Sequence, residues 1–177
     1  MRTYILISLV CCALLLTGCA GTCQSSHHGE YRNIALKAKD SRYPQAASNS
    51  VCRDEACFAA ENVIDSNTSN KGHGPKFPSW GPDKRTDLWL KIDFGKVVNV
   101  DKVVIYIRAD FPHDSYWKAG TIEFSDGSKE KMSLQKIASP QAFEFSSRRV
   151  KWLRITDLVQ DEPLGWCGIT EVEVWGR

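Results

Sequence analysis

The sequence lacks the signals of several common functional classes. Its 177 residues carry a formal net charge of only +2 and contain no basic run interleaved with aromatic residues, which argues against a nucleic-acid partner. It has no G-x-S-x-G, no H-E-x-x-H and no glycine loop of the kind that cradles phosphate. The neighbours His113 and Asp114, beside Tyr116, are the one catalytic candidate, and adjacency in sequence says little about geometry. We therefore do not expect an enzyme.

An apolar run long enough to span a bilayer is also missing. Residues 4–16, preceded by Arg2, form an apolar stretch of signal-peptide length. The stretch ends in L-T-G-C at 16–19, which resembles the lipobox of bacterial lipoproteins. That resemblance implies a signal peptide over 1–18 and acylation, palmitate included, at Cys19. We therefore expect a lipid-anchored, extracytoplasmic protein. Because Ala20 and not aspartate follows Cys19, the resemblance implies the outer membrane if the source is Gram-negative. An ordinary secretory signal with a chance cysteine is the alternative.

The seven cysteines include no close C-x-x-C pair, which makes a zinc site the weaker interpretation. Four of them follow the lipobox: Cys23, Cys52, Cys57 and Cys167. An extracytoplasmic compartment permits disulfides, and four cysteines allow three full pairings. A clip between Cys52 and Cys57, a tie between Cys57 and Cys167, and unpaired thiols all remain open.

What the sequence does contain is alternation of apolar and polar residues. Leu88, Leu90 and Ile92 alternate with polar or amphipathic neighbours, which is typical of a half-buried strand. Further strands are expected over 33–39, 103–108, 121–124, 130–134, 142–145, 150–158 and 170–175, with one or two helical turns within 53–64 and loops over 40–50 and 65–76. Many short strands and almost no helix predict an all-β, antiparallel β-sandwich over 33–177, after a flexible polar tether at 19–32.

Several motifs occur in a fixed order along this domain. They are N-I-A-L at 33–36, N-V-I-D-S-N at 62–67, Trp80, W-L-K-I-D-F-G at 89–95, F-S-D-G at 124–127, R-V-K-W-L-R-I at 149–155 and E-V-E-V-W-G at 171–176. Together they resemble the discoidin domain, also called the coagulation-factor type C domain, whose bacterial branch includes carbohydrate-binding module family 32. The resemblance implies a galactose-binding-like jelly roll whose ligand-binding loops lie at one end.

The same resemblance implies one structural calcium ion, enclosed by the loop after the first helix and a carboxylate near the C-terminus. Asp65 and Glu171 match the family's two carboxylates, and Asn62, Asn67 and Asn70 are candidates for further oxygen ligands. Calcium favours such sets of carboxylate and carbonyl oxygens. The alternative is that Asp65 caps a turn and Glu171 is a solvated strand residue.

Three loops combine aromatic rings, which stack on sugars, with planar polar groups, which bind hydroxyls. They cover 73–80, 108–117 and 161–167. The candidate ligand-binding residues are His73, Trp80, Arg108, Asp110, His113, Asp114, Tyr116, Trp117 and Trp166. Trp117 or Tyr116 is the expected stacking ring. In the alternative interpretation, the tryptophans plug the ends of the sandwich and the charges pair with each other.

The sequence therefore predicts a non-catalytic, lipid-anchored module that recognises a cell-surface or environmental glycan. A protein- or phospholipid-binding accessory subunit of an envelope complex is the alternative. Phospholipid binding of the discoidin type would call for exposed apolar spikes in the loops, and these loops are more polar than that.

Overall fold

A computed structural model describes residues 29–72, 74–109, 114–163 and 165–177. The predicted signal peptide, the predicted lipidation site Cys19 and most of the predicted tether lie outside these residues. So do Cys23 and the candidate ligand residues His73, Asp110 and His113.

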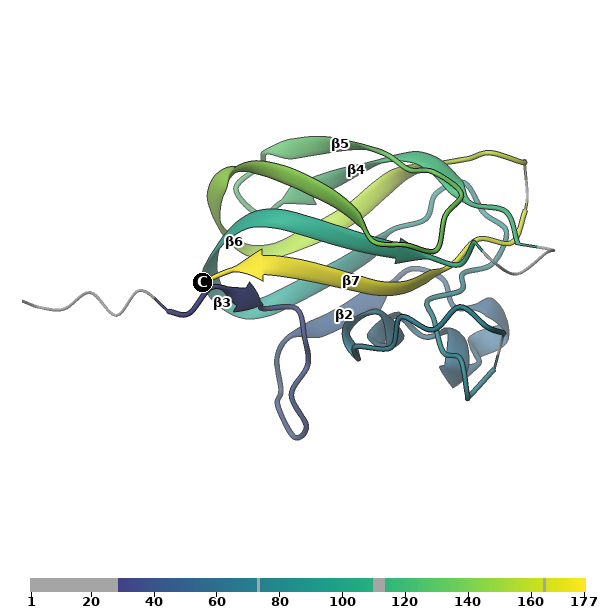
Figure 1. Ribbon diagram of the computed structural model, residues 1–177, viewed down its shortest axis with the longest axis horizontal. Coiled ribbons are helices and arrows are strands. Elements are labelled where there is room, and N and C mark those ends of the chain that lie inside the picture. Colours follow the sequence, from purple (N-terminus) through teal and green to yellow (C-terminus); the bar gives the residue numbers. More distant parts are fainter. Residues whose placement is uncertain (1–28, 73, 110–113, 164) are drawn as a thin grey trace, which may run out of the picture.

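The described residues form seven strands and three short 3-10 helices (Figure 1). In chain order these are β1 (Arg32–Asn33), β2 (Gln45–Ser48), η1 (Cys52–Asp54), η2 (Ala56–Phe58), η3 (Ala60–Ile64), β3 (Leu90–Ile107), β4 (Trp117–Phe124), β5 (Lys129–Ser133), β6 (Gln141–Gln160) and β7 (Ile169–Gly176). All the pairings between these strands are antiparallel. The predicted all-β sandwich is confirmed, and the helical turns expected within 53–64 are 3-10 turns.

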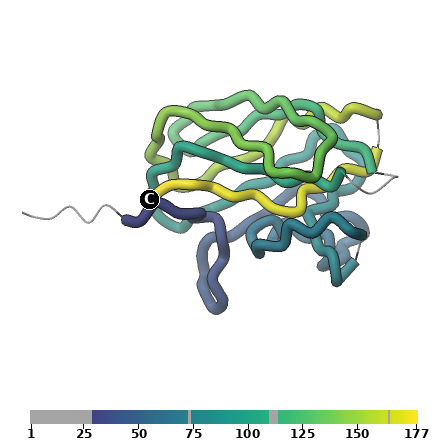
Figure 2. Tube along the Cα trace, viewed as in Figure 1, coloured from purple at the N-terminus to yellow at the C-terminus, as the bar shows by residue number. Residues whose placement is uncertain are grey.

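Two long strands join the layers of the sandwich. Residues 90–93 of β3 pair with β2 and with the second half of β6, whereas residues 98–105 pair with the first half of β6 and residues 100–107 with β7. The register shifts between Asp93 and Val98, where Gly95 has φ +71 and a Cβ would lie 2.4 Å from the Tyr43 ring. Such an irregularity bends a strand, so β3 passes from one layer into the other, as its path in Figure 2 shows.

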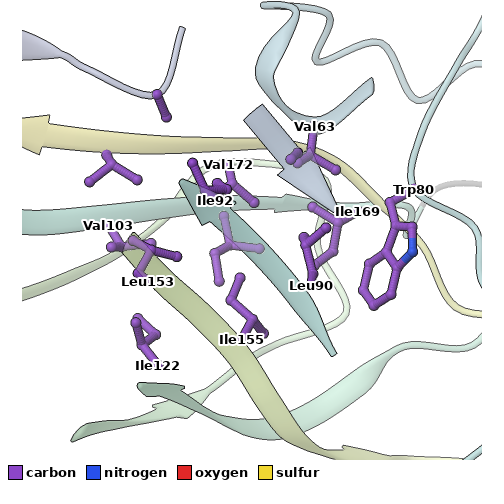
Figure 3. Close-up of a cluster of buried hydrophobic side chains, with 14 of the residues drawn as sticks. Val63, Trp80, Leu90, Ile92, Val103, Ile122, Leu153, Ile155, Ile169 and Val172 are labelled. Carbon is purple, nitrogen blue, oxygen red and sulfur yellow. The ribbon is translucent and has the colours of Figure 1, made fainter. Parts of the chain in front are cut away.

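The core lies between the two layers (Figure 3). One layer contributes the fully buried Ile92, Ile122 and Leu153, and the other contributes Val103 and Val172. Burial of these side chains on the facing sides of both layers is the main stabilising contribution.

Two details near the N-terminus differ from the prediction. The strand expected over 33–39 ends at Asn33, because the Asn33 side chain accepts hydrogen bonds from Ala35 N (3.0 Å) and Val174 N (3.0 Å) and turns the chain out of the sheet. Conversely, β2 occupies part of an expected loop. Its sequence, Q-A-A-S, has no β-branched or aromatic residue that would mark it as a strand.

The sandwich has two distinct ends. At the terminal end, β1 pairs with the last residues of β7 (Figure 1). At the opposite loop end lie the connections between β3 and β4 and between β6 and β7. In the described ranges, no helix is long and apolar enough to cross a membrane.

Candidate functional site

A cavity of about 260 Å³ opens at the loop end. Its lining residues come from η1, η2, the segment before β3 and the two loop-end connections: Cys52, Arg53, Phe58, Gly81, Arg108, Asp114, Trp166 and Cys167. Three of the predicted ligand residues, Arg108, Asp114 and Trp166, are therefore brought together here. The sandwich topology explains this, because β3 and β6 both end at this edge.

A buried ion pair forms the floor of the cavity. Arg108 Nη2 lies 3.1 Å from Asp114 Oδ2, and the two side chains are only 4% and 3% exposed. Arg108 Nη1 also donates to Ser79 Oγ (3.3 Å). Burial lowers the pKa of Arg108, and the Asp114 carboxylate opposes that effect. A buried pair of this kind keeps both charged groups at fixed positions in the wall of the cavity.

Backbone hydrogen bonds tie the two loop-end connections together. Ser115 N donates to Trp166 O (2.7 Å), and Arg108 N donates to Gly168 O (2.9 Å). A Cβ at Gly168 would lie 2.7 Å from Arg108 Cδ and 3.1 Å from Trp80 O, so the ion pair needs glycine at this position. Main-chain hydrogen bonds between the two connections thus hold the Arg108–Asp114 pair in place. The side-chain pattern of the sequence does not reveal these bonds.

The rim of the cavity carries an accessible aromatic ring and two cations. Trp166 is 36% exposed, and Lys84 Nζ lies 4.6 Å from its ring centroid. Arg53, whose side chain is 68% exposed, pairs with Glu55 at 2.6 Å. An accessible indole face can stack on a sugar ring, while neighbouring polar groups donate hydrogen bonds to the sugar hydroxyls or accept hydrogen bonds from them.

The structure does not support Trp80 and Trp117 as ligand contacts. Both side chains are fully buried, and their rings stack on each other with centroids 5.4 Å apart. Trp80 also bridges to β7 through backbone hydrogen bonds with Ile169 and donates from Nε1 to Ser50 O (3.0 Å). Both tryptophans are therefore core residues that close the sandwich, as the alternative interpretation held. Tyr116, the other expected stacking ring, is half-buried, packs against the core and is absent from the cavity lining.

Sequence reasoning missed five lining residues: Cys52, Arg53, Phe58, Gly81 and Cys167. The sequence predicts a helical turn at Arg53, yet Arg53 lies within η1 at φ 53, a left-handed conformation that is uncommon outside glycine. No motif marked it. Phe58 falls within the helical turns expected over 53–64, and its ring lies against Gly81 at the cavity wall.

Cys52, Cys57 and Cys167 are free thiols in the structure, so neither the clip between Cys52 and Cys57 nor the tie between Cys57 and Cys167 is present. Burial raises the pKa of the Cys167 thiol to about 12. Burial likewise raises the pKa values of Cys52 and Cys57. These thiols line or flank the cavity as weakly reactive groups.

A second polar cluster surrounds Glu171, one of the predicted calcium ligands. Its carboxylate is 1% exposed, accepts from Ser66 N through Oε2 (3.1 Å), and leaves Oε1 with no hydrogen-bond partner. Burial and the neighbouring Asp65 carboxylate raise its pKa to about 8. Asn70 also has an unsatisfied oxygen. Its Nδ2 donates to Ile107 O (2.8 Å), while its Oδ1 is buried without a hydrogen-bond partner.

The other two predicted calcium ligands have local structural roles. Asn62 donates from Nδ2 to the carbonyl oxygens of Ala56 and Ser79. Asn67 closes a turn, since its Oδ1 accepts from Ser69 N. No group of three or more His, Cys, Asp or Glu side chains suited to a metal occurs in the part of the chain that the structure describes. Of the two carboxylates at this cluster, Asp65 is exposed and closes a turn by accepting from Asn67 N (2.8 Å). The buried, unsatisfied oxygens of Glu171 and Asn70 suit a hard cation such as calcium.

Comparison with known proteins gives a family and a set of similar folds. The family model for the F5/8 type C domain matches residues 45–172. No curated protein matches the sequence.

Solved structures with similar folds include three sugar-binding modules. The lectin domain of Lectinolysin complexed with Lewis B antigen has a TM-score of 0.63 at 17% identity, over 82% of this chain and 97% of that one. The family 32 CBM from C. perfringens NanJ in complex with galactose has a TM-score of 0.57 at 18% identity, over 74% and 92%. The chitosan-binding module 1 of a chitosanase/glucanase from Paenibacillus sp. IK-5 has a TM-score of 0.56 at 20% identity, over 82% and 99%. At these identities the likeness establishes the fold.

Proposed function

Because the chain belongs to the F5/8 type C domain family, we propose that it binds carbohydrate through the cavity at its loop end. This family consists of non-catalytic binding modules, which confirms the expectation that the chain is not an enzyme. The observation that carries the proposal is the juxtaposition of the exposed Trp166 ring with the buried Arg108–Asp114 pair in one cavity.

The chemistry of this cavity suits a sugar better than it suits an apolar or a highly charged ligand. Trp166 offers an aromatic face, which packs against the C–H face of a pyranose ring. Arg53 and the Arg108–Asp114 pair offer donors and acceptors for hydroxyl groups. The Asp114 carboxylate neutralises Arg108 in the floor, so the cavity does not present a concentrated charge that would select a phosphate or a dicarboxylate.

The neighbouring folds support the ligand class. The Lectinolysin domain was solved with Lewis B antigen, the NanJ module with galactose, and chitosan-binding module 2 of the Paenibacillus enzyme with chitotriose. Those sugars differ widely in charge and linkage. We therefore extend to this chain the class, carbohydrate, rather than any one of those sugars.

We further propose that the chain binds one structural calcium ion at Glu171. The buried Oε1 of Glu171 and Oδ1 of Asn70 lack hydrogen-bond partners, and Asp65 adds a second carboxylate nearby. These groups would hold the ion, which would neutralise the two carboxylates and tie the loop after η3 to β7. Its role would be structural, since the cavity residues belong to other segments.

The third part of the proposal is the lipid anchor. The L-T-G-C motif at 16–19 supports acylation of Cys19 and an extracytoplasmic location. Acyl chains would tether the protein to a membrane while the loop-end cavity binds glycans.

A glycan array tests the proposed function. We expect the protein to bind a defined set of glycans, and Trp166→Ala to abolish that binding without unfolding the domain. Trp152→Ala is the matched control, because Trp152 is also partly exposed and also has a lysine over its ring, with Lys91 Nζ 5.0 Å from the centroid, but lies outside the cavity lining. A silent array together with a stoichiometric protein partner in a pull-down would instead favour the accessory-subunit function.

A further inference from the structure

The terminal end of the sandwich carries a concentrated positive charge. We define the terminal patch as residues 29–44, 95–102 and 175–177, which contain seven basic and three acidic side chains, whereas the whole chain has a net charge of only +2. Six of the basic side chains are exposed: Arg32, Lys37, Lys39, Arg42, Lys96 and Arg177. The acidic residues are Glu30, Asp40 and Asp101, and Asp101 is only partly exposed and accepts a hydrogen bond from the Tyr31 hydroxyl (2.7 Å).

Apolar side chains are exposed among these charges. Three of the six exposed large hydrophobic residues in the described ranges lie in the terminal patch: Tyr31 (38%), Leu36 (44%) and Val97 (44%). The Tyr31 ring lies 5.8 Å from the Trp175 ring, and Arg177 Cζ lies 5.2 Å from the Tyr31 centroid. A surface that mixes basic, aromatic and aliphatic side chains in this way is suited to the interface between headgroups and acyl chains.

The patch also has a concave part. A broad groove of about 1220 Å³ runs between the 29–44 segment, the β3 bend and Arg177. Its lining includes Leu36 and five basic residues, against the two acidic residues Glu30 and Asp65, so apolar and predominantly basic groups share one surface. In Figure 1 the segment between β1 and β2 projects from the sandwich on the side of the terminal end.

The position of the first described residue indicates which binding partner the terminal patch faces. Gly29, the first described residue, lines the same groove. Only nine residues separate Cys19 from Gly29 in the sequence, and the ten steps from one Cα to the next span at most about 35 Å when the chain is fully extended. An anchor at Cys19 would therefore hold the terminal end, rather than the loop end, near the bilayer.

We propose that the terminal patch docks on a membrane surface rich in anionic lipid headgroups. The inference rests on the lipid anchor in the proposed function. Basic side chains are attracted to the negative surface potential, while Tyr31, Leu36 and Val97 insert at the headgroup level. Docking at this end orients the domain so that the sugar cavity, at the opposite end, faces away from the bilayer. A soluble anion would engage the basic groups but would leave the exposed hydrophobic side chains without a partner.

Hydrogen–deuterium exchange on the full chain, reconstituted into vesicles, tests this. One vesicle population contains only phosphatidylcholine, and the other contains about 30 mol% phosphatidylglycerol. We expect residues 31–42 and 95–97 to exchange at least about threefold more slowly on the anionic vesicles, with the difference removed by about 0.5 M salt. The triple variant Arg32→Glu, Lys37→Glu, Lys96→Glu should lose the difference. The matched control, Lys118→Glu, Lys131→Glu, Lys136→Glu, changes three exposed lysines elsewhere by the same charge and should keep it.

Equal exchange on both vesicle types, or slower exchange at residues 81–87 of the loop end, overturns the docking surface. If Cys19 does not carry a lipid anchor, the result is different: the protein then does not co-float with phosphatidylcholine vesicles in a density gradient. The triple variant leaves the loop-end cavity intact, so its glycan binding should match that of the wild type.

Discussion

The rings of Trp80 and Trp117 stack with an interplanar angle of 21° and a centroid separation of 5.4 Å, and neither side chain is exposed. Trp80 comes from the segment before β3, and Trp117 opens β4. The pair therefore closes the core directly behind the loop-end cavity. It separates the buried hydrophobic interior from the polar loop end, where the Arg108–Asp114 pair lies.

This stack predicts that Trp117→Ala is a stability mutation rather than a binding mutation. Loss of a fully buried tryptophan leaves a cavity and should lower the free energy of unfolding by about 3–5 kcal/mol. Urea denaturation measures the change. Trp152→Ala, which removes a half-exposed ring, should lower the free energy of unfolding much less. Wild-type stability combined with lost glycan binding in Trp117→Ala would mean that the ring contacts ligand after all.

The ion pair in the cavity floor predicts strong coupling between its partners. Arg108→Ala and Asp114→Ala should each lower the free energy of unfolding by about 3–5 kcal/mol, because each leaves a buried charge without its partner. The double variant should cost clearly less than the sum of the two single variants. Denaturation of the four proteins of this cycle measures the coupling, and strict additivity would contradict the observed pairing.

The cluster at Glu171 predicts calcium-dependent stability. Addition of calcium at about 100 times its dissociation constant should raise the free energy of unfolding by about 2.7 kcal/mol, measured as a rise in Tm. Glu171→Gln should remove that rise. Glu173→Gln provides the control: it lies on the same strand, but its carboxylate accepts hydrogen bonds from Tyr106 and Trp175 instead. A calcium response retained in Glu171→Gln would rule out this ligand set.

The buried thiol of Cys167 predicts pH-dependent reactivity. Its pKa is raised to about 12, so the thiolate is scarce in the folded protein, and its fraction grows roughly tenfold with each pH unit below that value. Alkylation by iodoacetamide at pH 8 should therefore be much slower than in the urea-unfolded chain, where the thiol has an ordinary pKa of about 8.5. Peptide mass spectrometry resolves the site. Fast alkylation of Cys167 in the folded protein would contradict its burial.

Local pattern was sufficient to predict most of the strands and the layer architecture. The alternation around Leu90 and Ile92 places both side chains in the core, and the strand expected over 103–108 places Val103 and Ile105 there, whereas Val104 is not part of the core cluster. Both outcomes depend only on the period of two in a strand. The exception, β2, lacks that signal, since its four residues include only small or polar side chains.

The candidate site was predictable in part. The sequence identified Arg108, Asp114 and Trp166 by their chemistry and by their position in loops, but gave no means of separating Trp166 from Trp80 and Trp117. All three are tryptophans in or beside the loops, and exposure depends on which loop folds over which ring. Arg53 was missed for a related reason, because its left-handed backbone and its place at the cavity rim follow from contacts with distant segments.

The sequence by itself determined the strand pattern, the family and the chemical inventory of the loops, because these depend on residue type and on spacing along the chain. Only the tertiary structure decided which tryptophan faces solvent, that Arg108 and Asp114 meet beneath it, and that basic and apolar side chains gather at the opposite end. The physical reason is that exposure and charge pairing arise between segments brought together by the bend in β3 and by the register of β6, and neither is encoded in any short stretch of residues.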